Sequence, residues 1–166
     1  MTDFVVEQSP FGRIVVAPSL PEGRALFYTT IDFHGQLDAK IARDITAFIA
    51  ERFQIDATLA TCMQIHSANV TRVAHAPRWS ECDRCDALWS SDRGVALGIK
   101  VADCLPVTIF DDHDILANIH SGWRGAVQNI TAATLDAAPI DPARASAYLG
   151  PTIRVCCFEV GEEVAQ

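Results

Sequence analysis

The stretch P106-V-T-I-F-D-D-H-D-I-L-A-N-I-H120 carries the pattern that decides the fold. Two runs rich in β-branched and apolar residues, 106–110 and 114–120, are separated by the acidic turn 111–114. Runs of this composition bounded by turn residues are typical of β-strands. We therefore expect a β-sheet at the core of the protein, with this stretch inside it.

Further strand-like and helix-like segments lie on both sides of this stretch. Apolar residues recur three or four positions apart from Ile41 to Phe53, behind Asp38 as the cap, which predicts an amphipathic helix. Residues 126–136 predict a second helix, packed closely on the sheet, and 162–166 predict the first turn of a third. Strands are also predicted at residues 13–17, 24–28, 57–66, 69–74, 87–90, 95–101 and 145–149. The chain is therefore predicted to have an α/β fold.

The length and the apolar pattern indicate a single water-soluble unit. At 166 residues the chain is long enough for one domain with a buried core, so we expect one domain over residues 1–166. No segment approaches the roughly 20 uninterrupted apolar residues that cross a bilayer. The N-terminus M1-T-D-F-V-V-E7 lacks a basic-then-apolar leader. We therefore expect a cytoplasmic protein with no membrane partner.

The charge and the cysteines narrow the classes of function. A net charge of -8, with arginines scattered along the chain, opposes the phosphate backbone of nucleic acids. We therefore expect a small-molecule substrate and no nucleic-acid partner. The six cysteines are expected to be reduced thiols, available for a metal or for catalysis. The C82-D-R-C85 pair lacks a partner pair at zinc-finger spacing and is interpreted as incidental.

Two imidazoles and one thiol form the main candidate site. His66, Cys104 and His120 each lie just beyond an apolar strand-like run, where α/β sheets present functional groups to a crevice. One thiolate and two neutral imidazoles suit a tetrahedral zinc whose fourth position stays open, and they also suit copper. Considered one at a time, such residues more often have a structural role: Cys104 as a small buried side chain, and the two histidines as partners of backbone groups. A third interpretation makes Cys104 a nucleophile with His120 or His66 as its base.

Four neighbours are candidates for a supporting role. Arg124 and the glycine turn that includes Gly122 suggest an anion site, although an arginine paired with an acid is equally common. Trp123 is either a surface on which a base stacks or part of the core. Asp103 either orients a histidine or acts as a base, or it caps a turn.

Six blocks of this sequence, in this order and spacing, resemble the signature of the YfiH-like laccase-domain family. The family is also named purine nucleoside phosphorylase or peptidoglycan editing factor. The H-S-G-W-R-G and A-D-C-L-P motifs are the most specific parts of the resemblance. The blocks are Q64-I-H66, D86-A-L88, A102-D-C-L-P-V107, H120-S-G-W-R-G125, L149-G-P-T-I153 and C156-C-F-E-V-G161.

The resemblance implies a fold, a metal and a group of activities. The implied fold is a layered α/β sandwich with mixed β-sheets flanked by helices. The implied metal is zinc held by His66, Cys104 and His120. Members of the family are credited with phosphorolysis of adenosine, inosine and methylthioadenosine, with adenosine deamination, and with copper-dependent oxidation of phenols. A role in editing peptidoglycan precursors is also attached to the family. The resemblance thus implies a purine nucleoside and phosphate as partners, for a monomer or homodimer.

The sequence departs from the family pattern at both ends. Members usually carry an arginine and a glycine pair in a segment near the N-terminus, which Y28-T-T-I-D-F-H-G35 lacks. Members also continue past the E-V-G block, so we expect a YfiH-like domain without the usual C-terminal part. Three hypotheses follow from the sequence: a zinc-dependent purine nucleoside enzyme, a cysteine hydrolase acting on a peptidoglycan precursor, and a degenerate, non-catalytic binding module.

Overall fold

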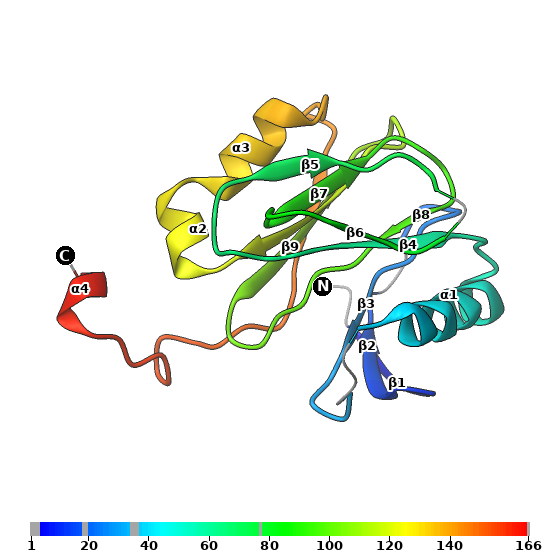
Figure 1. Ribbon diagram of the computed structural model, residues 1–166, viewed down its shortest axis with the longest axis horizontal. Helices are drawn as coiled ribbons and strands as arrows, with labels where there is room; N and C mark the ends of the chain where they lie inside the picture. Colours follow the sequence, from blue (N-terminus) through cyan, green and yellow to red (C-terminus); the bar gives the residue numbers. More distant parts are fainter. Residues whose placement is uncertain (1–3, 18–19, 34–36, 77, 166) are drawn as a thin grey trace.

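The computed structural model describes residues 4–17, 20–33, 37–76 and 78–165. Within these ranges the chain forms three β-sheets, two of which pack face to face, with helices on their outer sides (Figure 1). The mixed α/β architecture predicted from the sequence is confirmed.

The predicted hairpin lies at the centre of the largest sheet. Strand β9 (Leu105–Phe110) pairs antiparallel with β10 (Leu116–Ser121), so that Phe110 lies opposite Leu116 and Leu105 opposite Ser121. In the turn between them, Asp111 Oδ1 accepts the backbone N–H of Ile115 at 3.1 Å, which closes the loop. The sheet has the order β11-β9-β10-β7-β5, with β11 at Ser146–Leu149, β7 at Ala87–Ser90 and β5 at Val70–Arg72.

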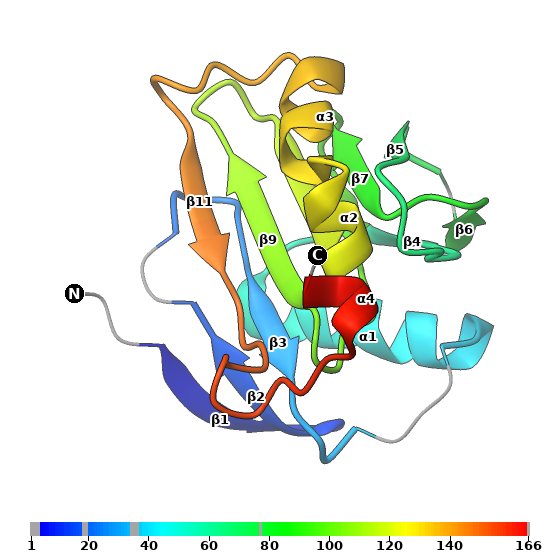
Figure 2. The same cartoon turned by 90° about the vertical axis from the view of Figure 1, so that its left-hand side faces the viewer.

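Two helices cover one face of this sheet (Figure 2). They are α2 (Trp123–Val127) and α3 (Ile130–Ala137). The sequence predicted one helix over 126–136, and this prediction was wrong about its continuity and its start. Asn129, with a φ of 59°, interrupts the helix in the left-handed conformation that asparagine tolerates better than most residues.

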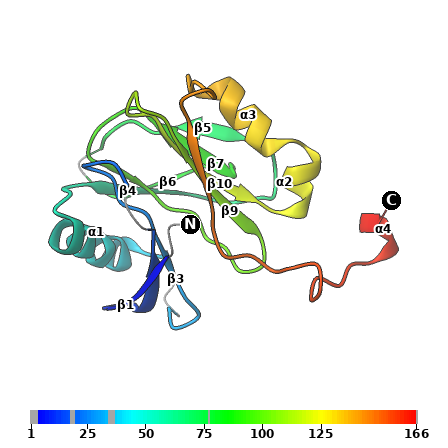
Figure 3. The ribbon, with the colours of Figure 1, turned by 180° about the vertical axis from the view of Figure 1, so that it is seen from behind.

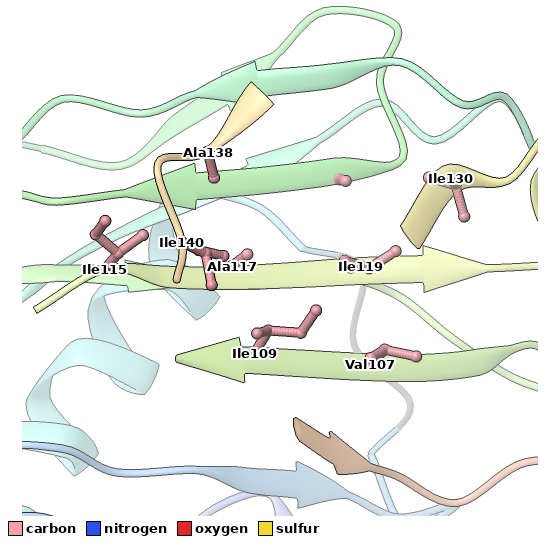
Figure 4. Packing of buried hydrophobic residues seen from close by; sticks show 9 residues of the cluster. Val107, Ile109, Ile115, Ala117, Ile119, Ile130, Ala138 and Ile140 are labelled. Atoms are coloured by element: carbon pink, nitrogen blue, oxygen red, sulfur yellow. The ribbon is translucent and has the colours of Figure 1, made fainter. Parts of the chain in front are cut away.

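A hydrophobic core fills the space between these helices and the sheet (Figure 4). Ile119 of β10 lies between Val107 and Ala87 in the strand register, and Ile130 of α3 belongs to the same buried cluster. Alternate residues of β10 point to the opposite face, where the Asn118 amide donates to the Leu97 carbonyl oxygen at 2.8 Å.

A smaller parallel sheet packs on that opposite face. It has the order β6-β4-β8, with β6 at Ser80–Cys82, β4 at Thr58–Cys62 and β8 at Val95–Leu97. Leu88 of β7 joins Ala60 and Cys62 of β4 in a second core cluster. The strands predicted at 57–66 and 95–101 are both shorter than expected, and β6 was not predicted because Ser80 and Glu81 give it a polar pattern.

The N-terminal part adds a third sheet and a long helix. Strands β1 (Val5–Ser9), β2 (Gly12–Val16) and β3 (Phe27–Thr29) form an antiparallel sheet in chain order. Strand β1 was not predicted, and β3 begins later than the expected 24–28. Helix α1 spans Ala39–Phe53 as predicted, and Asp38 caps it by accepting two backbone N–H groups at 2.8 Å. Phe11, Ile14 and Phe48 form a core of their own between sheet and helix.

Beyond β11, Thr152 and Ile153 still donate hydrogen bonds to the carbonyl oxygen of Asp103, and the segment after them extends away from the sheets (Figures 1 and 3). It ends in the short helix α4 (Glu162–Ala165), which agrees with the predicted helical turn. Among the described helices, none combines the length and the apolarity needed for a bilayer crossing.

We predict that Ile119→Ala lowers the free energy of unfolding by about 2–5 kcal/mol, because the cavity left in a close-packed core refills only partly. Ile119 is 0% exposed. Urea denaturation followed by circular dichroism measures the change. Ile31→Ala is the matched control, because that side chain is 81% exposed and its truncation should change the free energy by no more than about 0.5 kcal/mol. Equal losses in the two variants would contradict the packing described.

Candidate metal centre

The three predicted ligands meet at one place. The ligand atoms of His66, Cys104 and His120 all lie within 4.8 Å of one another. Cys104 directly precedes β9, and His120 lies near the end of β10 opposite Pro106, so the antiparallel register brings the thiol beside the imidazole. His66 comes from the loop after β4. The structure therefore brings together residues that are far apart in the sequence.

Two of the three residues lie elsewhere on their strands than the sequence predicted. The sequence predicted each of these three residues just beyond a strand, where α/β sheets present functional groups to a crevice. In the structure His120 lies inside β10, and Cys104 lies at the beginning of a strand that pairs antiparallel with β10. The convergence comes from the register of the β9–β10 hairpin and from the loop that follows β4, the central strand of the smaller parallel sheet.

Exposure differs among the three ligands. His120 is 3% exposed, Cys104 is half-buried and His66 is exposed. The two imidazole rings meet edge to face, with centroids 4.8 Å apart and planes at 79°. The centre is therefore reached from the side of His66, and its floor is formed by His120.

Asp86, which directly precedes β7, is a buried carboxylate beneath the centre. It is 0% exposed, and its Oδ1 lies 2.9 Å from His120 Nδ1. Both oxygens also accept backbone N–H groups from the loop that carries His66. Burial raises the pKa of Asp86, but the hydrogen bonds from His120, Ser67 and His66 outweigh it, and the pKa is lowered. No role was predicted for Asp86 from the sequence, although D86-A-L88 is one of the blocks that resemble the family signature.

Among the described residues, the charged groups that shift the pKa of the Cys104 thiol are carboxylates. Burial raises its pKa, and the carboxylates of Asp103 and Asp86 raise it further. A thiol becomes a metal ligand or a nucleophile as the thiolate. A bound cation would favour that thiolate, whereas the surrounding protein groups do not.

Because Gly122 has no side chain, His66, Cys104 and His120 can come close together beside it. A Cβ at this position would lie 2.9 Å from His66 Cδ2 and 3.0 Å from Cys104 Sγ, closer than ordinary contact. Zinc bonds of about 2.0–2.3 Å at tetrahedral angles place ligand atoms about 3.5 Å apart, so modest side-chain rotations would close this group around one ion. The donor set and the free space both fit a zinc or copper ion.

The remaining predicted residues lie around the Gly122 turn. Arg124 is exposed and stacks on the Trp123 ring at 4.3 Å, and among the described residues it has no acidic partner. Trp123 is half-buried, at the surface side of α2. Asp103 is exposed; its carbonyl oxygen accepts the Thr152 hydroxyl at 2.6 Å. The structure shows no hydrogen bond from the Asp103 carboxylate to either histidine.

The N-terminal sheet reaches the block that follows β11. A Cβ on Gly150 would lie 2.5 Å from Tyr28 Cε1 and 2.6 Å from Pro106 Cγ, so the Tyr28 ring lies directly against this glycine. Residues 34 and 35 of the segment that departs from the family pattern lie outside the described residues. Tyr28 shows that the beginning of that segment packs on the central sheet.

A family match covers most of the chain. The family described as multi-copper polyphenol oxidoreductase laccase matches residues 32–166. The chain belongs to this family. The matched range includes His66, Cys104 and His120 of the candidate centre.

Relatives of this laccase-domain chain carry enzyme names. A purine nucleoside phosphorylase of Bacteroides thetaiotaomicron is 32% identical over 155 residues, which cover 86% of this chain and 57% of the relative. Adenosine deaminase RL5, from an unknown prokaryotic organism, is 34% identical over 116 residues, which cover 62% of this chain and 44% of the relative. The chain spans about half the length of these curated relatives.

The fold has a solved counterpart. The crystal structure of Bacillus licheniformis hypothetical protein YfiH is similar with a TM-score of 0.67 at 22% sequence identity. The match covers 92% of this chain and 63% of that chain. The YfiH-like fold implied by the sequence motifs is confirmed.

We predict that Gly122→Ala lowers the affinity for Zn²⁺ roughly tenfold or more, by displacing the ligands as changes around a metal site commonly do. Its φ of -73° suits alanine, so the added methyl group acts through His66 and Cys104. Competition with a chromogenic chelator measures the affinity.

Gly23→Ala serves as the control for the added methyl group. At this glycine the φ of 77° strains an alanine backbone, but the Cβ would meet nothing within 4 Å. Zinc affinity should stay at the level of the unmodified chain. An unchanged affinity in Gly122→Ala would refute the role of that glycine.

Proposed function

We propose that this chain is a zinc-dependent purine nucleoside enzyme, acting in phosphorolysis of adenosine, inosine or methylthioadenosine and in adenosine deamination. The observation that carries the proposal is the convergence of His66, Cys104 and His120. Relatives of the same family are named purine nucleoside phosphorylase and adenosine deaminase, which supports the substrate class. Because the chain spans about half of those relatives, the activity of the whole protein is part of the proposal.

His66, Cys104 and His120 would hold the metal. When bound, zinc supplies Lewis acidity toward a water or a phosphate oxygen at neutral pH. Asp86 contributes by holding the ring of His120 at Nδ1, 2.9 Å away. The exposed side of His66 leaves the centre open to a substrate.

The turn after β10 supports the placing of substrate. Gly122 is in contact with the centre, and Trp123 and Arg124 follow it directly. The guanidinium of Arg124, stacked on Trp123 and without an acidic partner among the described residues, is free to bind phosphate. In this proposal Trp123 flanks the base. Asp103 would act as a base near the centre, although its carboxylate is exposed.

We predict that Cys104→Ala lowers phosphorolysis of adenosine roughly 100-fold or more, because a metal centre that loses a ligand binds its ion weakly. Chromatography of adenine and inosine formed from adenosine, with and without phosphate, separates phosphorolysis from deamination.

Cys82→Ala is the matched control for this substitution. Cys82 is a half-buried thiol like Cys104, and it lies on β6. It should retain activity close to that of the unmodified chain. Undiminished activity in Cys104→Ala would show that Cys104 is not part of the site. A zinc-loaded protein that turns over no purine nucleoside would favour the non-catalytic binding module instead.

A second candidate keeps the residues and omits the metal. The hydrogen bond from His120 Nδ1 to Asp86 orients the ring as in a base that serves a nucleophile, and Cys104 lies beside it. This arrangement would suit a cysteine hydrolase acting on a peptidoglycan precursor. The raised pKa of Cys104 counts against it, because burial and the carboxylates of Asp103 and Asp86 oppose the thiolate.

Metal removal and thiol alkylation separate the two candidates. We predict that chelation abolishes activity and that Zn²⁺ restores it, whereas iodoacetamide treatment of the metal-free protein prevents the restoration because alkylated Cys104 cannot bind zinc. Loss of activity on chelation, measured with adenosine, would oppose the cysteine hydrolase. Full activity in metal-free protein, lost only on alkylation, would oppose the zinc enzyme.

Copper-dependent oxidation of phenols is proposed only as a side activity. Thiolate and imidazole ligands suit copper. The family description names several coppers, whereas the part of the chain that the structure describes holds one such group of ligands. A single group does not provide the several sites of a multicopper oxidase.

A further inference from the structure

The carboxylate of Asp86 is bound on both oxygens. Oδ1 accepts the backbone N–H of His66 at 2.9 Å and lies 2.9 Å from His120 Nδ1. Oδ2 accepts the backbone N–H of Ile65 at 3.2 Å, and the N–H and hydroxyl of Ser67 at 2.7 and 2.8 Å. This one buried side chain therefore contacts both histidine ligands, one through its ring and the other through its backbone.

We propose that Asp86 is the positioning residue of the centre: it fixes the tautomer of His120 and the loop conformation of His66 before any ion binds. This role of Asp86 rests on the proposed function, because positioning the two histidines serves the binding of a metal ion. The tautomer of His120 and the conformation of the His66 loop do not depend on which metal or substrate binds.

The hydrogen-bond partners of Asp86 determine the tautomer of His120. Asp86 accepts four hydrogen bonds from N–H and O–H groups of residues 65–67, which favours the ionised carboxylate, and an ionised carboxylate can only accept. Nδ1 of His120 must then donate, and the lone pair of Nε2 remains free. Nε2 is the nitrogen left to bind an ion together with Cys104 and His66.

The loop conformation is also unusual. His66 has a φ of 58°, a left-handed conformation that is uncommon for a residue with a side chain. The N–H groups of three consecutive residues, Ile65 to Ser67, all point at Asp86. These hydrogen bonds hold the backbone in that conformation and so direct the imidazole of His66 toward the centre.

The test replaces one oxygen of Asp86 with an amide. In Asp86→Asn the remaining oxygen is expected to stay with the Ile65 and Ser67 donors. The NH₂ group then faces His120 Nδ1 and also the backbone N–H of His66, which loses its acceptor. Nδ1 must accept, so the proton moves to Nε2 and blocks the nitrogen that binds the ion. We expect this inversion of the tautomer and a fall in Zn²⁺ affinity of roughly 10–100-fold.

Two measurements read out the effect. Imidazole ¹⁵N–¹H correlation spectra of metal-free, histidine-labelled protein report the tautomer, and a His120→Gln variant assigns the signal. Competition with a chromogenic chelator reports the Zn²⁺ affinity. The tautomer is not changed by loss of stability alone, which separates positioning from a merely structural role.

Two controls match the substitution. Asp83→Asn makes the same change at an exposed position of the same loop and should leave tautomer and affinity unchanged. Ser67→Ala removes the hydroxyl bond to Oδ2 and not the bond to His120. It should lower the melting temperature while His120 keeps its Nδ1–H tautomer.

The His120 tautomer of the unmodified, metal-free chain tests the proposal even if Asp86→Asn does not fold. Finding His120 in its Nε2–H tautomer in the metal-free chain would overturn the inference, as would an Asp86→Asn protein with unchanged tautomer and Zn²⁺ affinity. An inactive but correctly protonated centre would count against the proposed function alone, since the tautomer is measured without metal or substrate.

Discussion

The antiparallel pairing of β9 with β10 is the constraint on which the rest of the molecule depends. Its register places His120 opposite Pro106 and so brings Cys104 beside the imidazole. The same pairing aligns Val107 with Ile119, and this apolar row receives α3. A shift of one residue would turn every side chain of β10 to the other face, so that the core and the centre would be lost together.

The two faces of β10 carry separate tasks. Ile119 faces the helices and contributes to the core, whereas His120, the next residue, faces the smaller sheet and Asp86. Because neighbouring residues of a strand point in opposite directions, a chemical group can be added on one side without opening the packing on the other. His120 is buried, and its Nδ1 is satisfied by the carboxylate of Asp86, which is buried with it.

Local patterns made the strands at 106–110 and 114–120 and helix α1 predictable from the sequence, whereas the grouping of His66, Cys104 and His120 was predicted mainly from the family resemblance. The run 106–120 consists of two apolar, β-branched segments separated by an acidic turn, and these segments form β9 and β10. Asp38 caps a helix in which apolar residues recur at regular spacing. Strand β6 and the interruption at Asn129 were missed, because a short polar strand depends on its neighbours and a left-handed asparagine has no periodic signal. Asp86 was missed for a related reason: its role depends on a loop some 20 residues earlier, and no local pattern reports such a contact.

The ligands differ in how much chain must close before they meet. Cys104 and His120 belong to one hairpin, whereas the chain between His66 and Cys104 contains the four strands β5, β6, β7 and β8. Closing a shorter loop costs less conformational entropy, so contacts within the hairpin form more readily than contacts across it. The centre is therefore expected to assemble in sequence during folding, with a two-ligand site on the hairpin first and the third ligand added when the His66 loop closes over Asp86.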